Sequence, residues 1–201
     1  MKKLDVAKSI IKKSGGIAKT AQLNDAGIQN SEIAKMCENG KIERIKHGYY
    51  QIADTMEVSE EKMIATFLQE GIVCMESALF HYGYSDKTPL VWTIAVPRTI
   101  TRTKLKIANL AYKVYFVQND KLTLGKTEGV FNGVSLPVYD RERTICDCFK
   151  YRSKMDSEVF NKAINAYVLD EEKKLGNLSR YAKEMRVYKK VTELMEVMLN
   201  G

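Results

Sequence analysis

The 201-residue chain has few of the residues that define disulfide-rich, metal-binding or membrane-spanning proteins. Its four cysteines form no C-x-x-C pair, so we expect reduced cytosolic thiols. Two histidines, His47 and His81, are too few and too far apart to complete a zinc site with those cysteines. No apolar run approaches the roughly 18 residues that a membrane helix needs. We therefore expect a cytoplasmic protein with no membrane segment, no metal and no cofactor.

Charge is uneven along the chain, whose formal net charge is +7. Residues 1–53 carry ten Lys and Arg against five Asp and Glu, and residues 54–97 carry two against seven. The sign changes again over residues 98–126, with seven against one. A basic surplus indicates either a polyanionic partner or a solvated surface. The two basic blocks are where a polyanion would bind, although 98–126 also suits a lysine-rich, solvated sheet surface.

Helical periodicity dominates the N-terminal quarter. Residues 4–14 carry apolar side chains at helical spacing, and Gly15 and Gly16 end that helix. Thr20 is expected to cap a second, short helix over residues 21–26, because its hydroxyl can accept a bond from a first-turn amide. The turn between the second and third helices then follows at residues 27–29.

A third helix and a hairpin complete this segment. Asn30 or Ser31 is expected to cap the helix, which Gly40 ends. Its expected apolar side consists of Ile33, Ala34, Met36 and Cys37. Residues 42–45 and 49–52 then have the character of two strands around a tight turn with a basic tip.

The middle of the chain alternates between helical and strand-like segments, and its end is helical. Helices are predicted over residues 57–69 and 75–82. The predicted strands are 90–96, 113–117 and 134–139, with Gly125, Gly129 and Gly133 marking turns or bulges. Four helices are predicted to finish the chain, the clearest over residues 158–169. Their apolar stripes are typical of a hydrophobic core.

Three short helices followed by a two-stranded ribbon form the winged helix-turn-helix arrangement, in which the third helix can enter a DNA major groove. We therefore predict an α+β protein with this domain at residues 1–55. A mixed α/β domain with a small sheet and terminal helices is predicted over residues 56–201.

Two sets of polar side chains in the first domain are candidates for contacts with DNA. The base-reading candidates, at the start of the third helix, are Gln29, Asn30, Ser31 and Lys35. The phosphate-binding candidates are Lys19, Thr20, Gln22, Arg44, Lys46, His47 and Tyr49. Glu32 also lies in this helix, and it would repel phosphates unless it accepts from a cytosine amine or points away.

Structural explanations compete with each of these interpretations. Asn30 and Ser31 are common helix caps in proteins that bind no nucleic acid. Tyr49 and Tyr50 should point to opposite faces of their strand, so one of them packs inward. A basic winged helix can also bind another protein, because fold does not determine function. An RNA-binding function is less favoured, since the chain has no aromatic strand motif of the RNP type.

The second basic block is expected to extend the DNA contact. Its candidate side chains are Arg98, Arg102, Lys104, Lys106 and Lys113. If residues 102–106 formed a strand, alternation would place three of these cations on one face of a sheet.

No catalytic motif is found. The acidic pairs of Asp140-Arg-Glu142 and Asp170-Glu-Glu172 have only a superficial likeness to metal-binding carboxylates, and phosphate-binding glycine-rich loops are absent. Asp140 can cap the helix that follows it, with Arg141, Arg143 and Asp147 in a local ion network. We therefore expect a protein that is not an enzyme and has no catalytic residue.

Two stretches of the chain resemble the AbiEi antitoxins of bacterial abortive-infection systems. They are TAQLNDAGIQNSEIAKMCENGKIERIKHGYYQI, and YDRERTICDCFKYR with the later LSRYAKEM. The resemblance implies a repressor that binds inverted repeats upstream of its own operon, with two molecules binding cooperatively. It also implies a type IV antitoxin in phage resistance, which antagonises a nucleotidyltransferase toxin without a stable complex. The Gly-Ser dipeptide common in such toxins is absent from this chain.

Overall fold

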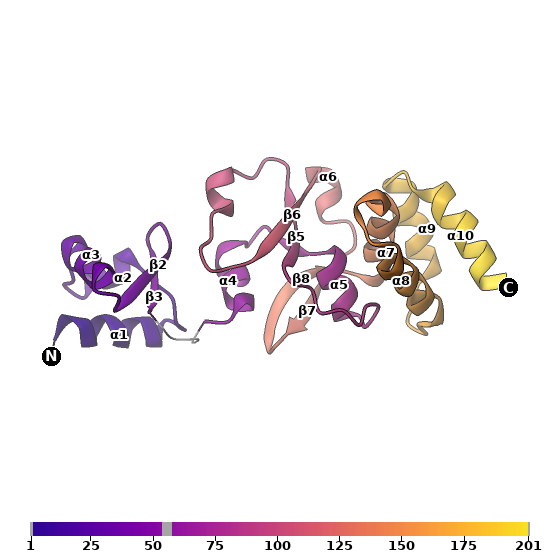
Figure 1. The fold of residues 1–201 in the computed structure, drawn as a ribbon. Coiled ribbons are helices and arrows are strands. Elements are labelled where there is room, and N and C mark those ends of the chain that lie inside the picture. The colour runs from indigo at the N-terminus through magenta and orange to yellow at the C-terminus, as the bar shows by residue number, and fades with distance from the viewer. Residues whose placement is uncertain (1, 54–57, 201) are drawn as a thin grey trace. The chain divides into compact units, whose positions relative to one another are not determined.

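The computed structural model describes residues 2–53 and 58–200, and both helices and sheets are present (Figure 1). Its contacts divide the chain into two compact units. The first unit contains Met1–Leu68 and Thr101–Leu110, and the second contains Gln69–Ile100 and Ala111–Gly201. The predicted α+β class is confirmed. The domain boundary predicted at residue 55 lies outside the described residues.

The first unit begins with helices and a hairpin in the predicted order. Its elements are α1 (Lys3–Lys13), β1 (Ala18–Lys19), α2 (Thr20–Asp25), α3 (Asn30–Glu38), β2 (Ile42–Lys46), β3 (Tyr49–Ile52) and α4 (Glu60–Phe67). The strands pair in the order β1-β3-β2, all antiparallel. Gly48 has a φ of +78°, which suits the tight turn between β2 and β3.

One apolar core holds the helices of the first unit against its hairpin. Ala7 and Ile11 of α1, Leu23 of α2 and Ile33 of α3 are buried together with Ile42 of β2. Their helical spacing explains this arrangement, because residues three or four apart lie on one helix face. The core therefore fixes one face of α3 inward and leaves its opposite face outward.

The predicted helix caps of this unit are wrong. Helix α2 begins at Thr20 itself, and the backbone N–H of Lys19 donates to Gln22 Oε1 over 2.8 Å. Helix α3 likewise begins at Asn30, and the backbone N–H of Gln29 donates to Glu32 Oε2 over 3.0 Å. In both helices the third residue reaches back to the amide before the helix, as in half of a capping box. Thr20, Asn30 and Ser31 are therefore not used as caps.

The segment of residues 101–110 corrects a second prediction. Arg102–Leu105 form a 3-10 helix, η1, so Arg102, Lys104 and Lys106 do not alternate along one sheet face. The segment packs within the first unit, where the backbone N–H of Ala108 donates to Ile45 O over 3.0 Å. A bond to the edge of the hairpin outweighs the weak strand preference of a lysine-rich stretch.

The second unit has a mixed sheet with strand order β6-β5-β4-β8-β7. These strands are β4 (Ile72–Val73), β5 (Trp92–Pro97), β6 (Tyr112–Val117), β7 (Lys126–Phe131) and β8 (Val134–Tyr139). Strand β6 pairs in parallel with β5, and β4 pairs in parallel with β8. The helices between the strands are α5 (Met75–His81) and α6 (Asn119–Leu122). The predicted strands at β5, β6 and β8 are confirmed, whereas β4 and β7 were not predicted.

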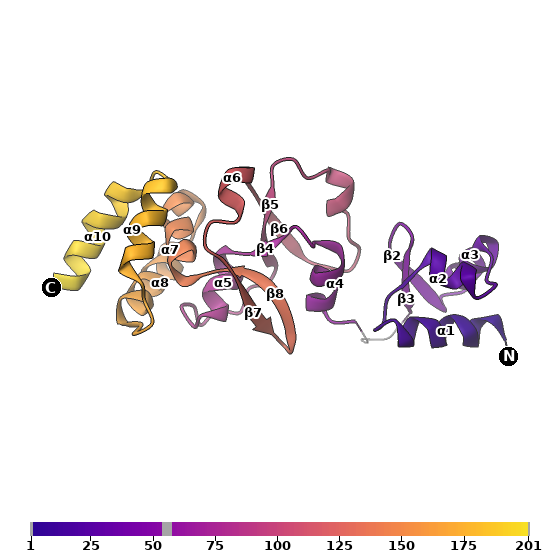
Figure 2. The same ribbon diagram turned by 180° about the vertical axis from the view of Figure 1, so that it is seen from behind.

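Helices end the second unit, as predicted, and their ribbons gather beyond one end of its sheet (Figures 1 and 2). They are α7 (Arg141–Lys150), α8 (Ser157–Leu169), α9 (Leu175–Glu184) and α10 (Tyr188–Asn200), with the 3-10 helix η2 (Arg152–Lys154) after α7. Asp140 caps α7 as predicted, because its Oδ1 accepts from the backbone N–H of Arg143 over 2.8 Å.

The predicted ion network at the start of α7 is correct only in part. Arg143 pairs with Asp147 over 3.3 Å, and both side chains are buried. Arg141 instead pairs with Asp170 over 2.9 Å and with Glu172 over 2.5 Å. Residues 141 and 143 point to different sides of the helix because they are two positions apart.

Candidate nucleic-acid interface

The outward face of α3 is polar and exposed. Asn30, Ser31, Ala34 and Lys35 are all exposed, whereas Ile33 is buried at 2% exposure. Ala34 was expected on the apolar side, and its exposure corrects that assignment. The reason is geometric: successive helix residues are about 100° apart, so the neighbour of a buried residue in a short helix turns toward solvent. The face can therefore offer hydrogen-bonding groups and a methyl group to a groove.

Glu32 does not belong to this outward face. Its carboxylate accepts from Lys3 Nζ of α1 over 2.8 Å and from the backbone N–H of Gln29 over 3.0 Å. The hydrogen bond from Lys3 and then that from Gln29 lower the pKa of Glu32 below its ordinary value. Because its charge is paired, Glu32 opposes an approaching phosphate less than an isolated carboxylate would.

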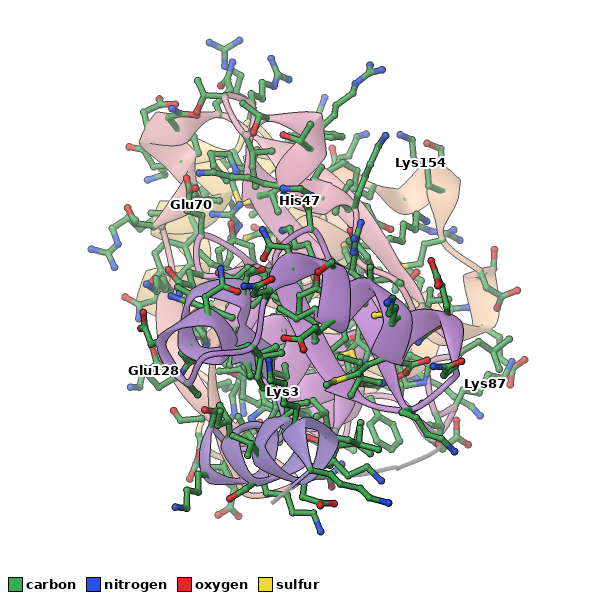
Figure 3. The ribbon with its side chains drawn as sticks, turned by 90° about the vertical axis from the view of Figure 1, so that its left-hand side faces the viewer. Lys3, His47, Glu70, Lys87, Glu128 and Lys154 are labelled. Carbon is green, nitrogen blue, oxygen red and sulfur yellow. The ribbon has the colours of Figure 1, made fainter. Side chains whose placement is uncertain are left out.

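The hairpin carries three of the predicted phosphate-binding side chains. Arg44 is exposed, with its guanidinium 5.8 Å from the centre of the Tyr50 ring. His47 is exposed at the turn and is labelled in Figure 3. Lys46 is only half-exposed, since its Nζ donates to Lys104 O over 2.8 Å, and burial lowers its pKa. Arg44 and His47 are thus more accessible to a phosphate than Lys46.

The tyrosine pair at the start of β3 splits as predicted. Tyr50 is buried at 6% exposure and joins the core. Tyr49 remains half-exposed and packs edge-on against Phe67 of α4, with 5.0 Å between ring centres. Tyr49 is therefore the more accessible of the two tyrosines to an outside partner.

Further candidate DNA-contacting residues of the first unit line a hollow of about 530 Å³. Lys19, Gln22 and Tyr49 line it together with Lys13 of α1 and Lys62 of α4. Thr20 lies beside it and is half-buried, with its backbone N–H donating to Gly48 O over 2.9 Å. Sequence reasoning missed Lys13 and Lys62 because only the tertiary fold brings their helices to β3.

The five cations of the second basic block do not form one stripe. Arg102, Lys104 and Lys106 are exposed on the 101–110 segment of the first unit. Arg98 and Lys113 belong to the second unit, where both line one cavity. The two groups therefore belong to different units of the chain.

Among the residues that the structure describes, no group of three or more His, Cys, Asp or Glu side chains could hold a metal ion. Within the same residues, no helix is long and apolar enough to cross a membrane. All four cysteines are free thiols, and burial raises the pKa of Cys74, Cys146 and Cys148.

Together, the buried side of α3, its exposed polar face and the neighbouring hairpin define a winged helix-turn-helix of the DNA-binding class. Residues 5–53 match the family described as "Transcriptional regulator, AbiEi antitoxin". This match confirms the predicted resemblance for that part of the chain, and the family that it matches is one of transcriptional regulators. No curated protein matches the chain.

The fold extends the comparison to most of the chain. The crystal structure of the RV2827C protein from Mycobacterium tuberculosis is similar, with a TM-score of 0.66 and 14% sequence identity. The similarity covers 89% of this chain and 70% of that one. At this identity, the likeness shows a shared fold for both units.

Proposed function

We propose that the chain is a sequence-specific DNA-binding antitoxin that represses its own operon. The observation that carries this proposal is the outward face of α3, where Asn30, Ser31 and Lys35 are exposed and neither Asn30 nor Ser31 serves as a cap. Asn pairs with adenine and Lys with guanine in the major groove. Arg44, His47 and Lys19 would bind phosphates and set the register of the helix. Since the proposed partner is the DNA of the operon, we propose that the protein acts in the cytoplasm.

The proposed operator consists of inverted repeats upstream of the operon, each bound by one molecule, with cooperation between the two. The chain would also counteract a nucleotidyltransferase toxin without a stable complex and without catalysis of its own. These parts of the proposal rest on the resemblance to the AbiEi antitoxins, which the family match of residues 5–53 supports. If the winged helix instead bound a protein, preference for the operon's own DNA would be lost.

The proposal predicts a preference for the chain's own upstream region. In a gel-shift titration of the full chain at physiological salt, we expect the upstream duplex to bind about 10³-fold tighter or more than a scrambled duplex of the same composition. Two inverted repeats should bind with a steeper curve than one repeat. Equal affinity for both duplexes would contradict sequence-specific binding and favour the protein-interaction alternative.

The exposed cations of the 101–110 segment supply a second prediction. We propose that Arg102, Lys104 and Lys106 extend the DNA contact through phosphates. Changing all three to glutamine should make the plot of log affinity against log salt shallower by up to about 0.9 for each lost contact, because fewer counterions are released. Gel-shift titrations with the upstream duplex over a range of salt concentrations measure this slope.

A matched variant separates this effect from the change in net charge. Lys174, Lys189 and Lys190 are exposed residues of the second unit, and replacing them by glutamine removes the same charge. We expect this control to keep the slope of the unchanged protein. A slope that falls equally in both variants, or in neither, removes the 101–110 segment from the interface.

A further inference from the structure

The second unit contains a cavity of about 940 Å³ along the free edge of β6. Arg98, just after β5, and residues of β6 and α6 form part of its wall. The C-terminal ends of α7 and α9 form the rest, together with Lys154 of η2, which is labelled in Figure 3. The volume lies near the upper end of the range of about 300–1,000 Å³ that small-molecule sites occupy.

Positive charge dominates the lining of this cavity. Seven of its fifteen lining residues are Lys or Arg, and two are carboxylates, Asp120 and Glu184. Both carboxylates lie against Lys121, which forms an ion pair with Glu184. The remaining cations make no ion pair with any residue that the structure describes; they are Arg98, Lys113, Lys150, Lys154, Lys183 and Arg186. The cavity is therefore a concave surface with uncompensated positive charge.

Helix ends explain only part of this charge. Lys150 and Lys183 lie in the last turns of α7 and α9, where cations stabilise the negative end of the helix dipole. Arg98 and Lys113 lie outside these helices, so the dipole does not account for them. Their convergence on one cavity points to an anionic ligand.

The backbone conformation of Arg186 is a second feature of this cavity, independent of the charge count. Arg186 follows α9 with a φ of +60°, a left-handed conformation that favours glycine. The backbone N–H of Val187 donates to Ala182 O over 2.9 Å, which is the closing bond of a Schellman motif. Glycine would therefore adopt this backbone conformation with less strain than arginine does. The guanidinium at the cavity wall supplies a reason for the side chain that the helix end does not.

An aromatic ring among the cations narrows the ligand class. Phe116 of β6 lines the cavity and is 45% exposed, which is unusual for a phenylalanine. An exposed aromatic ring beside basic residues is the combination that binds nucleotides, since bases stack on the ring and phosphates pair with the cations. We propose that this cavity binds a nucleoside polyphosphate, with its base on Phe116 and its phosphates among the unpaired cations.

The concave shape favours a free nucleotide over duplex DNA. A cavity of this volume can enclose a ligand of nucleotide size, whereas a duplex would contact only its rim. The proposal goes beyond regulation of the operon and does not depend on operator binding. Its test therefore uses a separate ligand and a separate measurement.

The test is isothermal titration calorimetry of the full chain with ATP and with inorganic tripolyphosphate at physiological salt. We expect saturable binding of both. The double variant Lys150→Gln/Arg186→Gly should weaken both roughly tenfold or more, because charge-assisted bonds to phosphate are lost. Phe116→Ala should weaken ATP by roughly tenfold and leave tripolyphosphate binding unchanged, because only the base stacks.

Controls keep these outcomes interpretable. Arg186→Gly places glycine where the backbone favours it, so its melting temperature should equal or exceed that of the unchanged protein. Lys189→Gln/Lys190→Gln, on the exposed part of α10, should bind ATP normally. Gel shifts with the upstream duplex should be the same for the cavity variants and the unchanged protein.

Three results would overturn the proposal. The first is the absence of saturable ATP binding at millimolar concentration, and the second is ATP binding that the cavity variants leave unchanged. The third is a loss of binding to duplex DNA of unrelated sequence in the cavity variants while ATP does not bind, which would make the cavity a phosphate-backbone surface. A failure of operator binding with ATP binding intact would affect only the proposed repressor function.

Discussion

Replacing Arg143 by methionine should lower the free energy of unfolding by about 3–5 kcal/mol, because it leaves the carboxylate of Asp147 buried without its partner. Both side chains are almost fully buried, and Arg143 Nε lies 3.3 Å from Asp147 Oδ2. Arg143 Nη1 also donates to the backbone oxygens of Lys121 and Leu124 over 2.8 Å each. The guanidinium further lies 4.1 Å from the centre of the Tyr139 ring. One substitution therefore removes several contacts at once.

Urea denaturation followed by circular dichroism measures this loss. The double variant Arg143→Met/Asp147→Leu should recover a large part of it, because an apolar pair leaves no isolated charge. Arg141→Met is the matched control: its ion pairs with Asp170 and Glu172 are partly exposed, so we expect a loss of about 1 kcal/mol or less. Equal losses at positions 141 and 143 would contradict a special role for the buried pair.

The penalty in Arg143→Met should also depend on pH. Burial raises the pKa of Asp147, and Arg143 opposes that rise. Without Arg143, the folded-state pKa of Asp147 rises further above its unfolded value. The destabilisation is then complete above the folded-state pKa and shrinks as the pH falls through it, because Asp147 takes up a proton in the folded state.

Local sequence signals predicted the first three helices and the hairpin of the first unit well, because these elements are short and end at or near glycines. Ile11 and Ile33 lie where helical periodicity placed them, and both are buried. The caps failed for a physical reason. Gln22 and Glu32 accept from the amides of Lys19 and Gln29, so α2 begins at Thr20 and α3 at Asn30, and the residues expected as caps are the first residues of their helices. The residue at which the backbone becomes helical is decided by the folded geometry.

Strands β4 and β7 illustrate what pattern alone does not reveal. Strand β4 is only Ile72–Val73, too short to show any periodicity. Strand β7 is mostly exposed and contains Gly129, which was interpreted as a turn or bulge. A Cβ on Gly129 would lie 2.8 Å from His81 Nε2, so close packing against α5 explains the glycine there. The imidazole of His81, which packs against Gly129, also stacks on Phe131 of β7 with 4.3 Å between ring centres.

The exposed face of α3 and the proposed nucleotide cavity also differ in how well the sequence predicts them. Asn30, Ser31 and Lys35 could be predicted because they belong to one helix. The nucleotide cavity could not, because its residues extend from Arg98 to Arg186 along the chain. Only pairing of β5 with β6 and packing of the terminal helices bring them together.

Asn30→Ala and Lys35→Ala should each weaken binding to the upstream duplex by about 1–3 kcal/mol, roughly tenfold to a hundredfold, because each removes a contact to a base edge. Binding to scrambled DNA should change much less, so the ratio of the two affinities falls. Asn30 caps no helix, which means that its replacement by alanine removes no capping bond from α3. A loss of affinity is then not explained by a loss of folding.

Asn39→Ala and Lys41→Ala are matched controls with the same residue types beyond the C-terminal end of the same helix. Both side chains are exposed, yet a helix that enters the groove by its N-terminal residues would not bring them to base edges. Gel-shift titrations of the four variants should therefore separate by position and not by residue type. If positions 39 and 41 mattered as much as 30 and 35, or if all four variants kept full specificity, α3 would not be the helix that reads the operator.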